Sequence, residues 1–172
     1  DGHDNKVVQP DDKPNENHAR ELLELHTLGV DGGYGQRDVL EAARCMSGWT
    51  YGHRFMRAGV SRVKFEPDRH DNGPKEVLGV KIPAGGGPND LEQLIDIVCE
   101  HPSTSRHIAQ RMARVFIADP APPDAVDAIA AAYRSSGGDI QKMLGAVLKQ
   151  QAFREHAGSL FKRPFRYVAS AL

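Results

Sequence analysis

Apolar residues recur every three to four positions along most of the chain, which is the spacing of an amphipathic helix. Residues that cap or interrupt helices, chiefly proline, glycine, asparagine and aspartate, stand between these segments. The connections are short, as is typical of antiparallel neighbours in a helical bundle. The pattern predicts helices over 16–28, 37–47, 89–100 and three further segments that begin at Pro102, Pro122 and Asp139.

Between residues 49 and 82 the apolar spacing changes to the alternation typical of strands. Val63 and Phe65 alternate with charged residues, and a second apolar run extends from Val77 to Ile82. These runs predict a small antiparallel hairpin or a three-stranded flap. The expected fold class is therefore mainly α, a helical bundle-like domain with a small antiparallel β hairpin or flap inserted at about residues 49–82.

The chain of 172 residues is long enough for one domain and short for two. Residues 1–14 are rich in aspartate, asparagine, lysine and proline, and we expect them to form a mobile lead-in. Residues 15–172 are predicted to form a single mainly helical domain. Because the sequence starts without methionine and ends within a helical pattern, we expect it to be an excerpt of a longer protein.

The charge balance narrows the classes of partner. Lysine and arginine number 22, and aspartate and glutamate number 23, so the formal net charge is −1. Nucleic-acid-binding proteins usually carry a basic excess, so this balance argues against a nucleic-acid partner. No apolar run approaches the roughly 20 residues that a membrane-spanning helix requires.

Cys45 and Cys99 are expected to be free buried thiols, although export of the protein would permit a disulfide between them.

Two further segments have both a structural and a functional interpretation. Residues 161–167 interleave cations and aromatic rings, as single-stranded nucleic-acid surfaces do, but one short cluster on a neutral chain favours packing against the helices. The Gly-Gly-Gly-Pro segment at 85–88 lacks the lysine and hydroxyl residue of a phosphate-binding loop. We expect it to be a connector, and a lid over a pocket is the alternative.

The first predicted helix carries one histidine on its apolar face. At about 100° per residue, His26 lies on the same stripe as Leu22 and Leu23, whereas Glu21 and Glu24 point away from it. A histidine in an apolar stripe is more often a buried, hydrogen-bonded side chain than a metal ligand. We therefore expect His26 to face inward, with a catalytic role beside Glu21 as the alternative.

His18 and Glu21 are three positions apart and so share one face of the same helix. Imidazole and carboxylate groups are common ligands of divalent metals. Two ligands do not make a site, so metal binding at His18 and Glu21 requires further ligands from other segments.

His70 and Asp71 begin an HDNG segment, whose residue types are typical of a turn. One interpretation is structural, with these side chains bonded to the local backbone and Lys75 neutralising Asp71. The other interpretation joins His70 and Asp71 to Glu21 or His18 in a cation-binding or acid–base pocket.

Several motifs resemble a known family. Residues 15–30, NENHARELLELHTLGV, resemble the signature of the bacterial domain of unknown function 1800 family, and the resemblance covers nearly the whole chain from residue 15 onward. At one position, Gly35, the family pattern has a hydroxyl residue that would cap the next helix. The other matching positions are 33–34, 38–39, 43–44, 47–50, 70–71, 73, 75, 78–79, 101–102 and 161–164.

The resemblance implies a cellular context and no activity. Members of the family are longer, and this chain resembles their C-terminal part. They are typically exported from bacterial cells, and their genes often neighbour those of a second exported family that resembles sulfatases. The resemblance therefore implies a periplasmic or extracellular protein, with an exported sulfatase-like protein as its candidate partner.

Two functional hypotheses follow. We expect an exported helical binding or scaffold module, because the sequence contains no complete catalytic constellation. The alternative is a metal-assisted or acid–base enzyme of the hydrolase type, in which a divalent metal would be the cofactor. The pocket of such an enzyme would draw on His18, Glu21, His26, His70 and Asp71.

Overall fold

The computed structural model describes residues 15–51 and 63–158 of the chain. The protein is mainly α, as the sequence pattern predicts, with short antiparallel strand pairs in its first half. It divides into two compact units, Asp1–Val98 (unit 1) and Cys99–Leu172 (unit 2). The expected lead-in over residues 1–14 lies outside the described residues, and a single domain over 15–172 stays a prediction.

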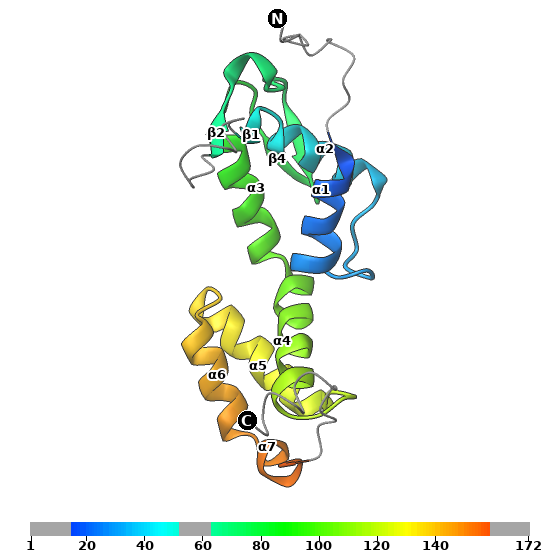
Figure 1. Cartoon of the computed structure of the whole chain (residues 1–172), viewed down its shortest axis with the longest axis vertical. Coiled ribbons are helices and arrows are strands. Elements are labelled where there is room, and N and C mark those ends of the chain that lie inside the picture. Colours follow the sequence, from blue (N-terminus) through cyan, green and yellow to red (C-terminus); the bar gives the residue numbers. More distant parts are fainter. Residues whose placement is uncertain (1–14, 52–62, 159–172) are drawn as a thin grey trace, which may run out of the picture. The chain divides into compact units, whose positions relative to one another are not determined.

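Helices form the framework of unit 1. The first runs from α1 (Glu16–Glu21) into the π-helical segment η1 (Leu22–Thr27), and α2 (Gln36–Met46) packs against α1 (Figure 1). The helix α3 (Asn89–Glu100) follows the strands in the sequence. These bounds agree within one residue with the helices that the apolar spacing predicts.

The starts of the first two helices are capped in different ways. The side chain of Asn15 accepts a hydrogen bond from the backbone N–H of Asn17 (3.1 Å), which satisfies a donor that the helix leaves free. Gly35 has no side chain with which to cap α2. The carboxylate of Asp38 instead accepts from the Gly35 N–H at 2.8 Å, so the reciprocal half of a capping box is kept.

The predicted inward position of His26 is wrong, because the helix widens before it. The N–H of Leu28 donates to the carbonyl of Leu23, five residues back, at 2.8 Å, whereas an α-helix bonds four residues back. The additional residue in this turn brings Thr27 and Leu28 to the core side and leaves His26 exposed. The Thr27 hydroxyl donates to the carbonyl of Leu22 (2.7 Å), so this buried polar group is satisfied.

The β insertion consists of two separate antiparallel pairs. Strand β1 (Trp49–Tyr51) pairs with β2 (Val63–Phe65), and β3 (Lys75–Val77) pairs with β4 (Val80–Ile82). The short 3-10 turn η2 (Pro67–Arg69) lies between the two pairs in the sequence. The predicted antiparallel hairpin is confirmed. The described residues contain no three-stranded flap, because Val63–Phe65 pairs with Trp49–Tyr51, whereas the run from Val77 to Ile82 folds back within the β3–β4 hairpin.

The turn between β3 and β4 contains a leucine in an unfavourable conformation. Leu78 and Gly79 have positive φ values of 51° and 78°, as the two central residues of a type I′ turn require. A bulky residue in this conformation costs about 1–3 kcal/mol. The backbone N–H of Leu78 donates to the Asp38 carboxylate at 2.7 Å, which ties the turn to α2 and compensates for part of this cost.

The core of unit 1 is built from aliphatic side chains. Helix α2 packs on α1 and on β3, so both of its neighbours contribute to one cluster. Such a core positions the polar side chains that lie at its edge. Its buried members are Ala19, Leu23, Leu28, Val39, Ala42, Ala43, Cys45, Val77, Ile82, Leu94 and Val98.

The two cysteines differ in exposure. Cys45 is fully buried, as predicted, and burial raises the pKa of its thiol to about 12. Cys99 is exposed, so the expectation of burial is wrong there. The buried residues of α3 repeat every four positions up to Val98, and the next residue points about 100° away from that stripe. Both thiols are free.

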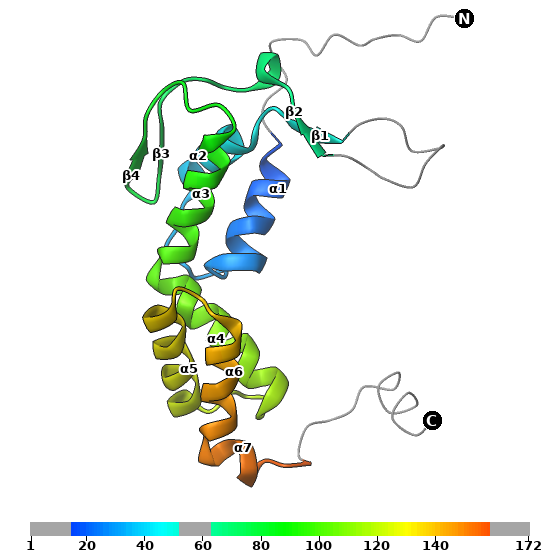
Figure 2. The ribbon, with the colours of Figure 1, turned by 90° about the vertical axis from the view of Figure 1, so that its left-hand side faces the viewer.

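Unit 2 is helical over its described residues, 99–158. It contains α4 (Pro102–Phe116), α5 (Pro123–Ser136), α6 (Ile140–Lys149) and the short α7 (Gln151–Glu155). Helix α5 packs against both α4 and α6 (Figure 2). Asp139 caps α6, as predicted, since its carboxylate accepts from two backbone N–H groups of the first turn. In the described parts of both units, no helix has the length and apolar character needed to cross a membrane.

The buried face of α4 differs from the predicted one. The apolar spacing of this segment predicts that Ile108, Met112, Val115 and Phe116 face inward. Ile108 and Met112 are partly buried against the core cluster, whereas Val115 and Phe116 are 50% and 45% exposed. Ala109, Ala113 and the C-cap residue Ile117, which are four residues apart, are buried and belong to the cluster that α4 shares with α5 and α6. The buried cluster of unit 2 comprises Ala109, Ala113, Ile117, Ala118, Ala125, Val126, Ile129, Ala130, Met143 and Val147.

Candidate functional site

The residues that the sequence singles out for chemistry do not gather at one place. His18 and Glu21 are exposed on α1 and His26 is exposed on η1, whereas His70 is buried. His70 and Asp71 bond to a different set of residues, contributed by α2, β3 and α3. Over residues 15–51 and 63–158, no group of three or more His, Cys, Asp or Glu is placed to hold a metal ion. The catalytic and metal-binding roles of these candidates stay predictions.

A buried carboxylate at the start of α3 is the centre of the polar cluster that contains His70. The Oδ2 atom of Asp90 accepts a hydrogen bond from the ammonium of Lys75 at 2.6 Å and lies 3.1 Å from Nε2 of His70. All three side chains have no solvent-exposed surface. Because buried charges are costly unless they are paired, this ion pair holds β3, the turn before it and α3 in one arrangement.

Lys75 uses all the donors of its ammonium group. In addition to Asp90, it donates to the backbone carbonyl of Asp71 and to that of Gly73 (3.0 Å). The neutralisation of Asp71 comes mainly from Arg44, whose hydrogen bond lowers the pKa of that carboxyl most, and the charge of Lys75 adds a smaller lowering effect. Lys75 itself contacts the Asp71 backbone and forms its ion pair with Asp90. Three protein acceptors leave this lysine no free donor for a ligand.

The His70 imidazole is held on both sides. Its Nδ1 atom lies 2.8 Å from the backbone carbonyl oxygen of Ser47, opposite the contact of Nε2 with Asp90. The ring of Phe65 packs beside it, with ring centroids 5.2 Å apart. The structural interpretation of the HDNG turn is thus the one that these contacts favour.

Ser47 links the end of α2 to the same turn. Its hydroxyl donates to the Arg44 carbonyl (2.7 Å), accepts from the Asp71 N–H (2.9 Å) and lies 3.3 Å from Nδ1 of His70. Ser47, His70 and Asp90 therefore form a series of hydroxyl, imidazole and carboxylate, the residue types of a hydrolytic triad. The hydroxyl proton is committed to the Arg44 carbonyl, however, and the imidazole has no surface that a substrate could reach.

Arg44 on α2 connects the buried cluster to the surface. Its Nε and Nη2 atoms donate to the two oxygens of Asp71 (2.8 and 3.1 Å), and its Nη1 donates to Glu41 (2.7 Å). The hydrogen bonds from Arg44 hold the pKa of the Asp71 carboxyl at about 2, and the same bonds raise the pKa of Arg44. The Glu41 carboxylate also accepts from the backbone N–H of Glu76 (3.1 Å), which fastens β3 to α2.

The glycine loop before α3 packs directly on the buried carboxylate. A Cβ atom built at Gly86 would lie 2.0 Å from Oδ1 of Asp90, so only glycine fits at this position. That same oxygen is buried and has no hydrogen-bond partner among the described residues. The close approach gives a structural reason for a glycine at 86.

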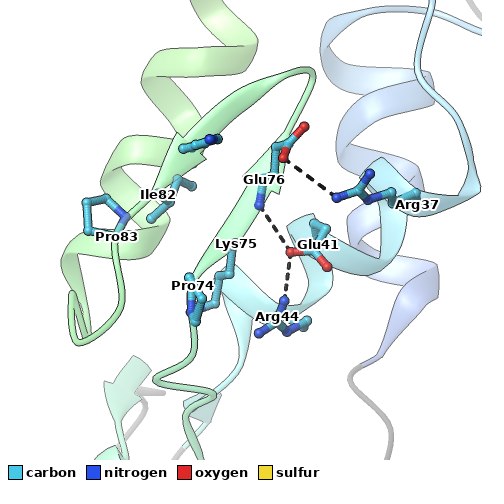
Figure 3. A pocket seen from close by; sticks show the side chains of 9 residues that line it. Arg37, Glu41, Arg44, Pro74, Lys75, Glu76, Ile82 and Pro83 are labelled. Atoms are coloured by element: carbon cyan, nitrogen blue, oxygen red, sulfur yellow. Dashed lines mark hydrogen bonds and ion pairs between the residues drawn. The ribbon is translucent and has the colours of Figure 1, made fainter.

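An open pocket lies beside this cluster, between α2 and the β3–β4 hairpin (Figure 3). Its volume is about 490 Å³. Figure 3 shows Glu76 pointing toward Arg37, and Glu41 lying between Glu76 and Arg44. The lining residues are Arg37, Glu41, Arg44, Pro74, Lys75, Glu76, Lys81, Ile82 and Pro83.

Exposure divides the charged lining of the pocket into a rim and a base. The Arg37 side chain is 75% exposed and lies 3.6 Å from the Glu76 carboxylate, which is 38% exposed. Arg44 and Glu41, by contrast, are 25% and 17% exposed. Lys81 is exposed and stands opposite Glu76 in the register of the hairpin, so the two side chains are on the same face. The rim is therefore formed by Arg37, Glu76 and Lys81.

One position in the sequence, Asp90, indicates this cluster, although the predicted site residues did not include it. Asp90, Leu94 and Val98 are four residues apart, which places Asp90 on the buried stripe of α3. A carboxylate on an apolar stripe predicts a buried cationic partner. The identity of that partner depends on a contact between residues far apart in sequence, so Lys75 could not be selected from the spacing alone.

Comparison with known proteins identifies a family. The family model described as "Protein of unknown function (DUF1800)" matches residues 1–172. Neither the curated proteins nor the solved structures gave a match.

Proposed function

The chain belongs to the DUF1800 family, and on that premise we propose that unit 1 is a binding module whose pocket receives part of a partner protein. The observation that carries this proposal is the open pocket between α2 and the β3–β4 hairpin, which has charged side chains at its rim. Its volume of about 490 Å³ is within the range of about 300–1,000 Å³ found for ligand sites. A pocket of this size accommodates one or two side chains of a partner.

The bonds beneath the pocket support recognition by a preformed surface. Glu41 bonds to the Glu76 backbone, and Lys75 bonds to Asp90, so helix α2, strand β3 and helix α3 are held together below the rim. A surface that is already ordered loses little conformational entropy when it binds. The buried contacts that keep His70 away from solvent therefore also stabilise the elements that form the pocket.

The family resemblance supports a location and a partner for this module. Family members are typically exported, and their genes often neighbour genes for exported sulfatase-like proteins. We place this protein outside the cytoplasm and propose the sulfatase-like protein encoded nearby as its partner.

The test is capture of that partner by the full-length protein. Both full-length proteins are purified, and their dissociation constant is measured by calorimetry for the wild type, Arg37→Glu and Arg106→Glu. Arg106 is a matched control, because it is an exposed arginine in an ion pair with Asp127 in unit 2. We expect Arg37→Glu to weaken binding by about tenfold or more and Arg106→Glu to leave it unchanged. Absence of binding by the wild type, or equal binding by Arg37→Glu, would contradict the proposal.

The alternative is an acid–base or metal-assisted hydrolase that draws on His18, Glu21, His26, His70 and Asp71. In the structure the Ser47 hydroxyl lies 3.3 Å from Nδ1 of His70. Ser47→Ala separates the two functions, with an aryl acetate ester as the substrate and urea unfolding as the measure of stability. Loss of esterase activity at unchanged stability would favour the enzyme. Loss of stability without any activity to lose would favour the binding module. Elemental analysis of the purified protein tests the metal-assisted version, which requires stoichiometric metal.

A further inference from the structure

We propose that the pocket of unit 1 selects a carboxylate, presented by an acidic peptide segment with an apolar neighbour, and that Arg37 and Lys81 are the residues that bind it. This inference rests on the proposed function, because it names the chemistry that the pocket would recognise in a partner. The residues that line the pocket differ in how many of their hydrogen-bond donors and acceptors are already paired within the protein, and the proposal is based on this difference.

The carboxylates in the pocket lining already have partners. Glu41 accepts from the Arg44 guanidinium at 2.7 Å and from the backbone N–H of Glu76 at 3.1 Å. The Glu76 carboxylate lies 3.6 Å from Arg37. A cationic ligand would have to compete with these contacts for the same oxygens.

The two cations at the base of the pocket are also occupied. Arg44 donates from three nitrogens to Asp71 and Glu41, and Lys75 donates to three oxygens, one of them on Asp90. Their charge is paired within the protein. Lys75 has no donor left for a ligand, whereas Arg44 uses three of its five N–H donors in these bonds.

The two cations at the rim are different. Arg37 is 75% exposed and has one ion-pair contact, although a guanidinium carries five donors in a planar fork that suits a carboxylate. Lys81 is exposed, and within the described parts of the chain its ammonium has no hydrogen bond or ion pair. Both cations share a single neighbouring carboxylate, that of Glu76. The rim therefore has a surplus of positive charge and of unused N–H donors.

The charge surplus is confined to the rim. The lining holds four cations and two carboxylates, but Arg44 is paired with Asp71 and Glu41, and Lys75 is paired with Asp90 and has no exposed side-chain surface. At the rim, Arg37 and Lys81 share the single carboxylate of Glu76, so an entering carboxylate meets one excess positive charge. Electrostatic complementarity of this kind favours an anion over its neutral isostere.

Two prolines give the pocket an apolar side. Pro74 and Pro83 are exposed and precede and follow the hairpin, so both lie at its open end beside the charged rim. An apolar side chain next to the bound carboxylate could pack on these rings while the acid reaches Arg37 and Lys81. The expected ligand is therefore an acidic residue with an aliphatic neighbour rather than a free inorganic anion.

The probe for this inference is the peptide N-acetyl-Leu-Glu-amide, with N-acetyl-Leu-Gln-amide as its neutral isostere. Binding to the ¹⁵N-labelled full chain is followed by NMR, using the Arg37 side-chain Nε–H signal and the backbone signals of β3 and β4. The variants are Lys81→Met, which keeps the length of the side chain without its charge, and Lys142→Met as the matched control. Lys142 is an exposed lysine of unit 2 that lies near Asp139.

We expect the glutamate peptide to shift the Arg37 and hairpin signals and to bind about tenfold more tightly than the glutamine peptide. Lys81→Met should weaken binding of the glutamate peptide by about fivefold or more, and Lys142→Met should not change it. Equal responses to the two peptides, no response to either, or an unchanged affinity in Lys81→Met would overturn the inference.

The outcome separates this inference from the proposed function. If the full-length partner binds through Arg37 but the peptides do not discriminate charge, the module stands and its carboxylate selectivity fails. If the glutamate peptide binds and the sulfatase-like protein does not, the pocket chemistry stands and the proposed partner is wrong.

Discussion

At the scale of single residues, Asp90 has the largest structural role in unit 1. Its Oδ2 atom is the only charged partner of the Lys75 ammonium within the described residues, and both side chains are fully buried. Asp90→Asn leaves that ammonium buried without a counter-charge, which should lower the free energy of unfolding by about 3–5 kcal/mol. Urea unfolding followed by circular dichroism measures the change.

Asp127→Asn is the matched control for this prediction. Asp127 also pairs with a cation, Arg106, at 2.8 Å, but the two side chains are 64% and 66% exposed. An exposed pair contributes about 0–1 kcal/mol, so the control should remain close to the wild type. Equal effects of Asp90→Asn and Asp127→Asn would show that the buried pair is not a main support of unit 1.

Gly86→Ala tests the close packing of the glycine loop on the same carboxylate. The added methyl group would lie 2.0 Å from Oδ1 of Asp90, so either the loop or the carboxylate must move, at a cost of about 1–3 kcal/mol. Gly145→Ala is the control, because Gly145 lies within α6 with no atom near its Cβ position. There alanine should stabilise the helix by about 0.5–1 kcal/mol. Thermal unfolding should therefore move in opposite directions for the two variants.

The ion pair of Asp71 predicts a dependence of stability on pH. Hydrogen bonds from Arg44 hold the pKa of the Asp71 carboxyl at about 2 in the folded protein, below its ordinary value of 3.8. This stabilisation is fully present above the ordinary value and is lost as the pH falls toward 2. Asp71→Asn should lower the free energy of unfolding at pH 7 and make its fall between pH 4 and pH 2 shallower. Parallel pH profiles of the wild type and the variant would contradict this assignment.

At the scale of elements, the first helix shows where sequence periodicity succeeds and where it fails. The cap at Asn15 and the buried Ala19 and Leu23 follow from residue types and from a period of 3.6. The position of His26 does not, because the hydrogen bonding changes to the five-residue spacing of η1 within the helix. No residue type in this segment indicates a π-helical turn. A prediction that assumes a fixed angle per residue therefore places His26 in the core instead of Thr27.

That correction leads to a paired prediction for η1. His26→Ala should change the free energy of unfolding by less than about 0.5 kcal/mol, because the side chain is exposed. Thr27→Ala should cost about 1 kcal/mol, since the buried Thr27 hydroxyl donates to the Leu22 carbonyl at 2.7 Å. Chemical unfolding of the two variants measures both, and a larger loss in His26→Ala would contradict the π-helical register.

The strands and the polar cluster show the same division between local and long-range information. The alternation of Val63 with Phe65 and the run from Val77 to Ile82 predicted strands that the structure contains. The pairing of each run depends on turns rather than on alternation, so a three-stranded flap and two hairpins could not be distinguished. The bonds of Lys75 to Asp90 and of Arg44 to Asp71 join residues 15 and 27 positions apart, beyond the reach of any periodicity.

In the molecule as a whole, the two units differ in the residues that they bury. The core of unit 2 is a helical cluster rich in alanine, whereas unit 1 combines an aliphatic core with a buried ion pair at its edge. The pocket, its charged rim and the network beneath it all belong to unit 1. If the protein is a binding module as proposed, unit 1 is the unit that contacts the partner.

Hydrogen–deuterium exchange of the full-length protein, with and without saturating sulfatase-like partner, tests this assignment most directly because it needs no substitution. We expect bound partner to slow exchange in the peptides that cover the β3–β4 hairpin and α2, which form the walls of the pocket. Exchange in the peptides of α5 and α6 serves as the internal reference. If the hairpin and α2 exchange as fast with saturating partner as in the free protein, the proposed binding role of unit 1 is contradicted.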